Sequence, residues 1–255
     1  MDLIAIASGF GVGAIVGMTG VGGGSLMTPL LISVFKLHPA VAIGTDLWFA
    51  AITKTSGAVA HHRGGSVDFT IVGRLLAGSI PASLVTIGLM HFTGITKGWA
   101  SAITFTLGIA LLLTALTVAY KKTWHRLGMR LERWIPESRK PVLTVACGAV
   151  LGVLVSLSSI GAGAIGATFI LLLYPRLEAR RLVGSDIAHA VPLTLVAGIG
   201  HASLGNVDWN LLAPLLLGSI PGIWLGAQLT RKLPDRLVRG ALCASLVTAG
   251  LKVIH

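Results

Sequence analysis

Long apolar stretches recur along almost the whole chain and are separated by short polar loops. They run at about 3–18, 24–35, 40–60, 69–92, 98–120, 141–157, 162–174, 182–203, 209–230 and 236–254. About 20 apolar residues are enough for a helix to cross a bilayer of roughly 30 Å. The stretches are continuously apolar rather than alternating, which argues against membrane β-strands. The pattern therefore predicts an all-α polytopic membrane protein.

The two halves of the chain are similar in sequence. Residues 44–81 align with residues 184–221 at a constant offset of 140, without a gap. The identical pairs include Gly44 and Gly184, Asp46 and Asp186, His61 and His201, and the Gly-Ser-Ile-Pro runs at 78–81 and 218–221. Duplicated apolar halves with glycine-interrupted segments at matching places are typical of secondary transporters. We expect two repeats of about five helical segments each, over 1–120 and 141–255, joined by a linker over 121–140.

Each repeat begins with a stretch that is too long for one straight crossing. As a single helix, residues 3–35 would be roughly 50 Å long, and the glycine-rich run 20–24 interrupts them. The stretch either crosses once with a kink, or enters the membrane and returns. If both such stretches return, 15 of the 20 lysines and arginines lie on one side and 3 on the other. If both cross once, the split is 9 against 9.

The positive-inside rule favours the returning form. Each repeat then makes an odd number of passes, so the fold has two inverted-topology repeats with Gly-rich broken helices. This predicts a multi-pass protein of a bacterial inner (plasma) membrane, with the central loop cytoplasmic and both termini periplasmic. Within the loop, Trp124, Leu127, Leu131 and Trp134 share one helical face among basic residues. That pattern suits an amphipathic helix on the membrane surface, and a solvated basic linker is equally compatible with it.

Composition and charge exclude several classes of protein. Hydrophobic residues make up 54% of the chain and charged residues 11%, against about 25% charged in soluble domains. The net charge of +11 comes from basic residues in short loops, so it indicates membrane orientation and no nucleic-acid partner. Cys147 and Cys243 lie inside apolar segments, and we expect no disulfide, no metal site and no cofactor.

The glycine-rich breaks are the first candidate for the chemistry. Half-helices beginning near Ser25 and Ala164 would point their N-terminal ends toward the middle of the membrane, where free N–H groups and partial positive charge suit an anion. The alternative is that these glycines only allow close helix packing. The candidate substrate-binding residues are Thr19, Gly20, Gly22, Gly23, Gly24, Ser25, Lys54, Ser158, Ser159, Gly161 and Gly163.

Lys54 is included because it lies about two-thirds of the way along an apolar segment. Intramembrane cations are costly and usually functional, and the counterpart of Lys54 in the second repeat is Thr194. We expect Lys54 to be an anion ligand, or a charge that changes partner during transport. The alternatives are that its ammonium reaches the cytoplasmic surface or pairs with a buried carboxylate.

A second group of residues is a candidate for coupling or gating. It consists of Thr45, Asp46, His61, Ser185, Asp186, His189 and His201. Asp46 and Asp186 suit proton coupling, with His189 as a partner, and a structural role beside the opened backbone is an equal alternative. His61 and His201 end their segments, where a capping role competes with a gating role. Asp68 and Asp208 stand just before apolar segments and are predicted N-caps.

Two runs in the first repeat, Gly20-Val-Gly-Gly-Gly-Ser-Leu-Met-Thr-Pro-Leu-Leu and Ala42-Ile-Gly-Thr, resemble the TauE/SafE family of membrane permeases. In the second repeat, Gly205-Asn-Val-Asp-Trp and Gly218-Ser-Ile-Pro-Gly carry the resemblance. The family is associated with export of sulfite and movement of small anions such as sulfoacetate or organosulfonates. The resemblance implies that the glycine-rich breaks line the anion path. Two positions depart from the family pattern: Asp46, where Ser is frequent, and Phe169, opposite Thr28-Pro29.

The sequence thus predicts a secondary transporter that exports a small sulfur-containing anion by alternating access. A proton-coupled uptake permease for an organic anion and an anion channel remain alternatives. No HExxH or GxSxG motif is present, so we expect no enzyme. The expected partners are the small anionic substrate, the lipid bilayer and protons. The oligomeric state is left open, a homodimer included.

Overall fold

The described part of the chain is helical throughout. The computed structural model describes residues 2–19, 24–93, 97–229 and 235–254. The helices are α1 (Asp2–Thr19), α2 (Gly24–Ser33), α3 (Pro39–Arg63), α4 (Phe69–Thr93), α5 (Lys97–Ala119), α6 (Lys121–Leu131), the short 3-10 helix η1 (Glu137–Arg139), α7 (Lys140–Ser158), α8 (Ala164–Leu173), α9 (Ala179–Ser203), α10 (Trp209–Leu229) and α11 (Asp235–Ile254). Over the described residues no strand occurs, so the all-α prediction is confirmed.

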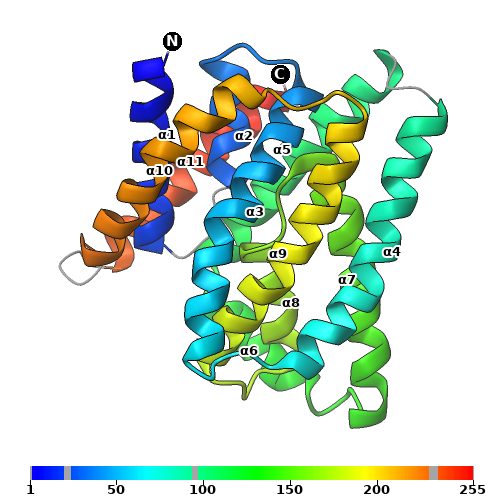
Figure 1. Cartoon of the computed structure of the whole chain (residues 1–255). Helices are drawn as coiled ribbons and strands as arrows, with labels where there is room; N and C mark the ends of the chain where they lie inside the picture. Colours follow the sequence, from blue (N-terminus) through cyan, green and yellow to red (C-terminus); the bar gives the residue numbers. More distant parts are fainter. Residues whose placement is uncertain (1, 20–23, 94–96, 230–234, 255) are drawn as a thin grey trace.

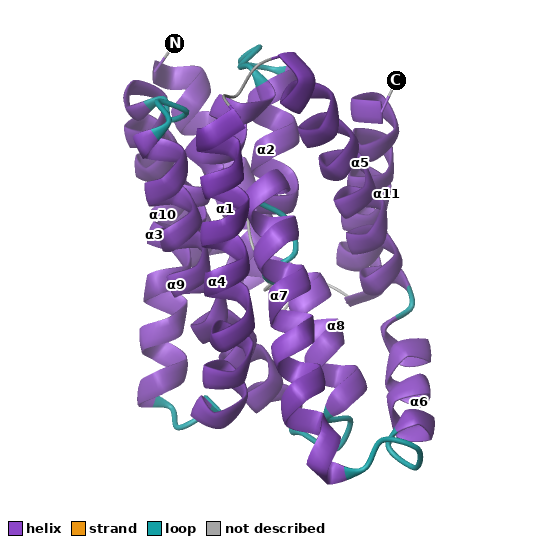
Figure 2. Ribbon diagram, turned by 90° about the vertical axis from the view of Figure 1, so that its right-hand side faces the viewer, coloured by secondary structure: helices purple, strands orange, loops and turns teal. Residues whose placement is uncertain are grey.

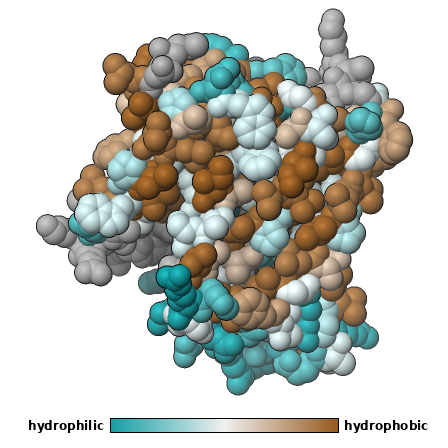
Figure 3. All heavy atoms as spheres, in the orientation of Figure 1, coloured by the Kyte–Doolittle hydropathy of each residue, from teal (hydrophilic) through white to brown (hydrophobic). Residues whose placement is uncertain are grey.

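Five of the described helices are long and apolar enough to cross a membrane. They lie at Phe69–Thr93, Ser101–Ala119, Glu137–Ser158, Ala179–Ser203 and Trp209–Gly226. α3 has 25 residues but is less apolar, because it carries polar groups such as Asp46 and Lys54 that are buried inside the protein. Figure 3 shows hydrophobic side chains over the middle of one face and hydrophilic side chains gathered at the end where α6 lies.

The two ends of the molecule differ. The first turns of α1 and the last turns of α11 lie at one end, and α6 lies at the other (Figures 1 and 2). α6 is a regular helix in the linker, with its Gly128 buried and most of its other residues exposed. The central basic segment therefore lies at the opposite end of the molecule from both termini.

Each interrupted stretch goes in and comes back. The Tyr174 hydroxyl, just after α8, lies 2.8 Å from Thr144 Oγ1 in the first turns of α7. Ala5 near the start of α1 and Leu31 near the end of α2 belong to one buried cluster. The break between α7 and α8 contains Gly161 at φ 127° and Gly163 at φ 140°, conformations that strain other residues. Of the two courses that the sequence leaves open, the structure takes the returning one.

The two halves are joined by closely packed helix pairs. α1 packs along α10, and α4 packs along α7. A Cβ at Gly78 of α4 would overlap the Val145 carbonyl of α7, and a Cβ at Gly218 of α10 would overlap the Ile6 carbonyl of α1. Gly13 faces Ser219 in the same way. These glycines let helix backbones touch, which is a common means of packing between membrane helices.

α3 and α9 form the centre of the molecule and run in opposite directions. Near the start of α3, Thr45 Oγ1 accepts a hydrogen bond at 2.9 Å from the N–H of Asp208, just beyond the end of α9. Near the start of α9, Ser185 Oγ accepts one at 2.8 Å from the N–H of Asp68, just beyond the end of α3. Because the beginning of each helix lies beside the end of the other, the pair is antiparallel.

The two predicted N-caps are confirmed. Asp68 Oδ1 accepts hydrogen bonds from the N–H groups of Thr70 at 3.1 Å and Ile71 at 3.2 Å at the start of α4. Asp208 Oδ1 accepts one from Leu211 at 3.0 Å at the start of α10. Each carboxylate satisfies N–H groups that have no partner within the helix.

Candidate functional site

Polar side chains are buried between α3 and α9 in the interior of the fold. Thr45, Asp46, Thr53 and Lys54 come from α3 and Ser185, Asp186, His189, Thr194 and His201 from α9, and all of them are buried. In a membrane protein such residues need internal partners or a polar ligand, because the lipid offers neither. The α3–α9 interface is therefore the place to look for function.

Lys54 reaches a small cavity at this interface. The cavity has a volume of about 130 Å³ and is lined from the first half by Val16, Thr53, Lys54, Ser56 and Gly57. From the second half it is lined by Gly163, Asp186, Ile187, Ala190 and Ile223. At about 30 Å³ per water molecule, it has room for about four waters or one small anion. Two hydroxyls, an ammonium and a carboxylate thus meet in one small space.

The Lys54 ammonium is held by the opened backbone of the second break. Its Nζ donates a 2.6 Å hydrogen bond to the carbonyl of Ala162, between α7 and α8. The side chain is 8% exposed, so it does not extend to the surface. Lys54 is also the charged neighbour of both Asp46 and Asp186, although no ion pair within 4.0 Å joins these described residues. One cation therefore lies between two carboxyl groups.

The two carboxyl groups lie at the beginnings of the half-helices. Asp46 accepts a hydrogen bond from the Thr28 hydroxyl in α2. Asp186 lies against the beginning of α8, close to the backbone of Gly163, and a side chain at Gly166 would collide with its Oδ1. In the second half, Thr168 donates to the carbonyl of Ala164 in its own helix instead. Both carboxyl groups thus contact a half-helix, Asp46 through the Thr28 hydroxyl and Asp186 through the Gly163 backbone, and Asp186 also lines the Lys54 cavity.

Among the described residues, several buried polar atoms near this interface have no hydrogen-bond partner. They include Asp46 Oδ1, Asp186 Oδ1, Ser159 Oγ, His189 Nδ1 and His201 Nδ1. Buried polar groups are normally paired, so a cluster of unpaired ones indicates trapped water or a polar ligand. The cluster surrounds the break between α7 and α8 and continues along α9.

Three serines that the sequence reasoning missed extend the polar interior toward α4 and α7. Ser79 Oγ lies 2.9 Å from His189 Nε2, and Ser83 Oγ lies 2.7 Å from Ser156 Oγ. His201 Nε2 lies 2.9 Å from the carbonyl of Ser156. The available signal was Ser79 in the repeated Gly-Ser-Ile-Pro run, since a serine within an apolar helix can bond across to a neighbouring helix.

The predicted residues of the glycine-rich breaks have different positions. Gly20, Gly22 and Gly23 lie outside the described residues, as do the side chain of Thr19 and the surroundings of Gly24. Ser25 is buried. Ser158 Oγ is engaged locally, donating to the carbonyl of Leu154 at 2.6 Å. Ser159 is in the left-handed region at φ 59° and lies beside Asp46, and of the two break glycines Gly163 lines the cavity whereas Gly161 packs against α7.

The remaining coupling candidates lie away from the cavity. The Thr45 hydroxyl accepts a hydrogen bond from the loop after α9, and the Ser185 hydroxyl accepts one from the loop after α3. His61 Nδ1 lies 2.9 Å from Ser66 Oγ in the turn after α3, and its ring packs against Gly184 of α9. Among the described residues, no group of three or more His, Cys, Asp or Glu side chains has the arrangement of a metal site.

Comparisons with known proteins agree on one family. The family model described as "Sulfite exporter TauE/SafE" matches residues 5–253. The "Probable membrane transporter protein YjnA" of Bacillus subtilis is 40% identical over 257 residues, covering 100% of both chains. A second protein of that organism, "Probable membrane transporter protein YdhB", is 28% identical over 96% of this chain and 97% of its own length.

A "Probable membrane transporter protein" of Haemophilus influenzae is 24% identical over 98% of this chain and 97% of its own length. No solved structure matches the chain. Since the family model spans nearly all residues and one relative is 40% identical along the whole chain, this chain is a membrane transporter of the TauE/SafE family.

Proposed function

We propose that the protein is a secondary transporter that exports a small sulfur-containing anion, such as sulfite, sulfoacetate or a related organosulfonate. The observation that carries the proposal is Lys54, an ammonium group buried in the interior beside a cavity of about 130 Å³. The family description, sulfite exporter, supports the same substrate class. The relatives are named as transporters, which supports a protein that moves its substrate without transforming it.

Lys54 acts as the anion ligand in this proposal. In the structure it donates to the Ala162 carbonyl, and the anion competes with that carbonyl for the ammonium. Thr53 and Ser56 line the same cavity, but their hydroxyls donate to carbonyls of α3, so Lys54 is the main donor. A buried cation binds an anion strongly, because the site is shielded from water.

The charge balance of the site gives protons a role. Lys54 with ionised Asp46 and Asp186 carries a formal charge of −1, which repels an incoming anion. Protonation of one carboxyl group makes the site neutral and removes the repulsion. We assign that proton to Asp186, because Asp186 lines the cavity, whereas Asp46 is bonded to Thr28. His189 on the same face of α9, bonded to Ser79, is its nearest candidate exchange partner.

Alternating access in this scheme follows from two inverted repeats. The antiparallel α3–α9 pair supports the inversion, since these helices occupy matching places in the two halves. The helix packing supports the inversion as well, because α1 of the first half packs on α10 of the second, and α4 of the first half packs on α7 of the second. The two halves rock about the α3–α9 interface and expose the Lys54 cavity to each side in turn.

The membrane potential favours export in the proposed orientation. We place the protein in the bacterial inner (plasma) membrane, with the α6 end in the cytoplasm and both termini in the periplasm, since the basic loops gather at the α6 end. An inside-negative potential drives an anion outward by about 2.3 kcal/mol per charge per 100 mV. Export of this kind needs no ATP.

The test is sulfite flux in proteoliposomes under an imposed potential, comparing wild type with Lys54→Ala. We expect saturable, potential-driven efflux that Lys54→Ala removes and Thr194→Ala retains, because Thr194 Oγ1 bonds only carbonyls of its own helix. Sulfate and sulfoacetate serve as competing anions. Absence of flux for every sulfur anion contradicts the proposed substrate class. Continuous conductance favours the channel alternative, and uphill uptake driven by a pH gradient favours the permease alternative.

A further inference from the structure

The linker helix α6 is fixed to the protein at its C-terminal half. Gly128 packs against the end of α8, where a Cβ would lie 2.7 Å from the Leu171 carbonyl. Glu132, just after α6, forms an ion pair at 3.0 Å with Arg176 in the loop that follows α8. The position of α6 is therefore set by contacts with the second half, and its N-terminal half projects beyond them.

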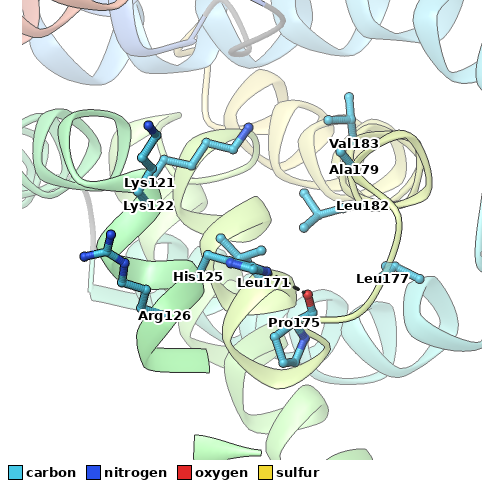
Figure 4. Close-up of a pocket in the computed structure, with 10 residues that line it drawn as sticks. All are labelled: Lys121, Lys122, His125, Arg126, Leu171, Pro175, Leu177, Ala179, Leu182 and Val183. Atoms are coloured by element: carbon cyan, nitrogen blue, oxygen red, sulfur yellow. Dashed lines mark hydrogen bonds between the residues drawn. The ribbon is translucent and has the colours of Figure 1, made fainter. Parts of the chain in front are cut away.

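That N-terminal half forms one wall of a groove of about 540 Å³. The α6 wall is basic and consists of Lys121, Lys122, His125 and Arg126. The facing wall is apolar and includes Leu171, Leu177, Leu182 and Val183 from α8, α9 and the loop between them. Figure 4 shows Lys121, Lys122 and His125 on one side of the opening and Leu182 and Val183 on the other, while the Arg126 side chain extends away from Leu182 and Val183. The groove is amphipathic, with its charge on one side and its hydrocarbon on the other.

The cations of the groove have no carboxylate counterion within the described residues. Among the described residues, no carboxylate lies within 4.0 Å of Lys121, Lys122 or Arg126. His125 Nε2 is 3.1 Å from the carbonyl of Pro175. The nearby acids Glu132 and Glu137 are paired with Arg176 and Lys140. Glu178 adjoins two lining residues in sequence but is exposed and does not line the groove. Three positive charges thus lie along the groove without a carboxylate partner in the described part of the chain.

The location of the groove indicates which anion it meets. α6 lies at one end of the helix bundle, where the hydrophobic surface gives way to hydrophilic side chains (Figures 1 and 3). This is the depth of the lipid headgroups for a protein whose long apolar helices cross the bilayer. A ligand there must pair a negative head with an apolar body to match both walls.

We propose that this groove binds the headgroup of an anionic phospholipid from the adjoining leaflet, of the phosphatidylglycerol class. The phosphate lies against Lys121, Lys122 and Arg126, and the first segments of the acyl chains lie along Leu182 and Val183. The volume of about 540 Å³ accommodates the glycerophosphate head and leaves the chains in the bilayer. Basic pockets at the cytoplasmic ends of membrane helices are suited to such headgroups.

The test measures lipid binding to the purified full-length protein in a neutral detergent, by native mass spectrometry. Phosphatidylglycerol and phosphatidylcholine of equal chain length are the probes, with glycerol 1-phosphate as the free-anion probe. The groove variant is Lys121→Gln/Lys122→Gln/Arg126→Gln. The control, Arg130→Gln/Arg133→Gln/Arg139→Gln, removes the same charge from the same segment but outside the groove lining. At about fivefold per cation, the groove variant should bind phosphatidylglycerol about 100-fold more weakly.

The expected result is preference for phosphatidylglycerol over phosphatidylcholine in wild type and control, lost in the groove variant. Equal losses in both variants would show diffuse surface attraction and overturn the site. Equal binding of the two lipids overturns it as well, and displacement of the lipid by glycerol 1-phosphate at equal concentration points instead to a free-anion site. A Lys121→Arg/Lys122→Arg variant changes two of the same positions but keeps their charge. It should bind phosphatidylglycerol as wild type does, which would show that substitution at these positions does not by itself disrupt the fold.

Discussion

The two halves of this transporter share a scaffold and differ inside it. Both halves have a close glycine contact between long helices, at Gly78 and Gly218. In both halves an aspartate, Asp68 or Asp208, caps the helix that follows the central helix. The turn before each of these aspartates contains a glycine with positive φ, Gly65 or Gly205. These shared features all concern backbone geometry.

Two interior positions differ between the halves. Lys54 in the first half corresponds to Thr194 in the second, and His189 in the second half corresponds to Phe49 in the first. Ser79 bonds across to His189, while its counterpart Ser219 bonds the Leu216 carbonyl of its own helix at 3.1 Å. The duplication thus supplies the framework and the aspartate pair, whereas Lys54 and His189 are each present in only one half.

The largest effects are expected from exchanging the central pair. Lys54→Thr gives the first half the residue of the second, and we expect transport to fall about 100-fold or more, as for loss of a buried charge that binds a partner. Thr194→Lys should instead prevent accumulation of folded protein, because Thr194 is fully buried beside apolar residues. Efflux rates in proteoliposomes and yield of folded protein in detergent measure the two outcomes. An active Lys54→Thr protein would refute the assignment of the anion ligand.

Asparagine substitutions at Asp186 and Asp46 should distinguish a role in proton coupling from a structural role. Asp186→Asn is expected to lower flux driven by a pH gradient more than tenfold, since the cavity then lacks its titrating group. Asp46→Asn should mainly lower stability, by about 1–2 kcal/mol, because it weakens the bond with Thr28. Flux at several pH gradients and thermal unfolding in detergent distinguish them. Unchanged pH dependence in both variants would exclude proton coupling through these carboxyl groups.

The glycine contacts should respond alike in the two halves. Gly78→Ala and Gly218→Ala each place a methyl group against a backbone carbonyl, and overpacking of this kind costs about 1–3 kcal/mol of stability. Gly88→Ala, also on α4, meets nothing within 4 Å and is the matched control. Thermal unfolding in detergent is the measurement. A strong effect in only one half would show that the two helix pairs are not equivalent.

The smallest effect is expected at the serine pair. Ser79→Ala removes the bond to His189, which contributes roughly 1 kcal/mol, so we expect a few-fold fall in pH-driven flux. Ser219→Ala removes only a bond within its own helix and should leave flux unchanged. The two variants are compared at equal reconstituted amounts. Equal behaviour of the pair would argue that His189 takes no part in proton exchange.

The sequence predicted much of the fold because the signals were local or repetitive. Apolar stretches fixed the helices to within a few residues, and the Asp68 and Asp208 caps followed from their place before such stretches. The site was harder to predict. Burial of Lys54 was expected, but its bond to the Ala162 carbonyl joins residues 108 positions apart. No periodicity reports a contact of that kind, and Ser83 and Ser156 were missed for the same reason.

The sequence by itself determined that this is a polytopic helical membrane protein with two related halves, because the apolar stretches and the internal duplication can both be read directly from the order of residues. It also placed the chain in its family through short motifs. Only the tertiary structure decided which of two equivalent aspartates lines a cavity and which accepts a hydrogen bond from Thr28. The same holds for the groove beneath α6. The physical reason is that a cavity or a groove is formed by side chains brought together from separate helices, and packing alone sets their relative position.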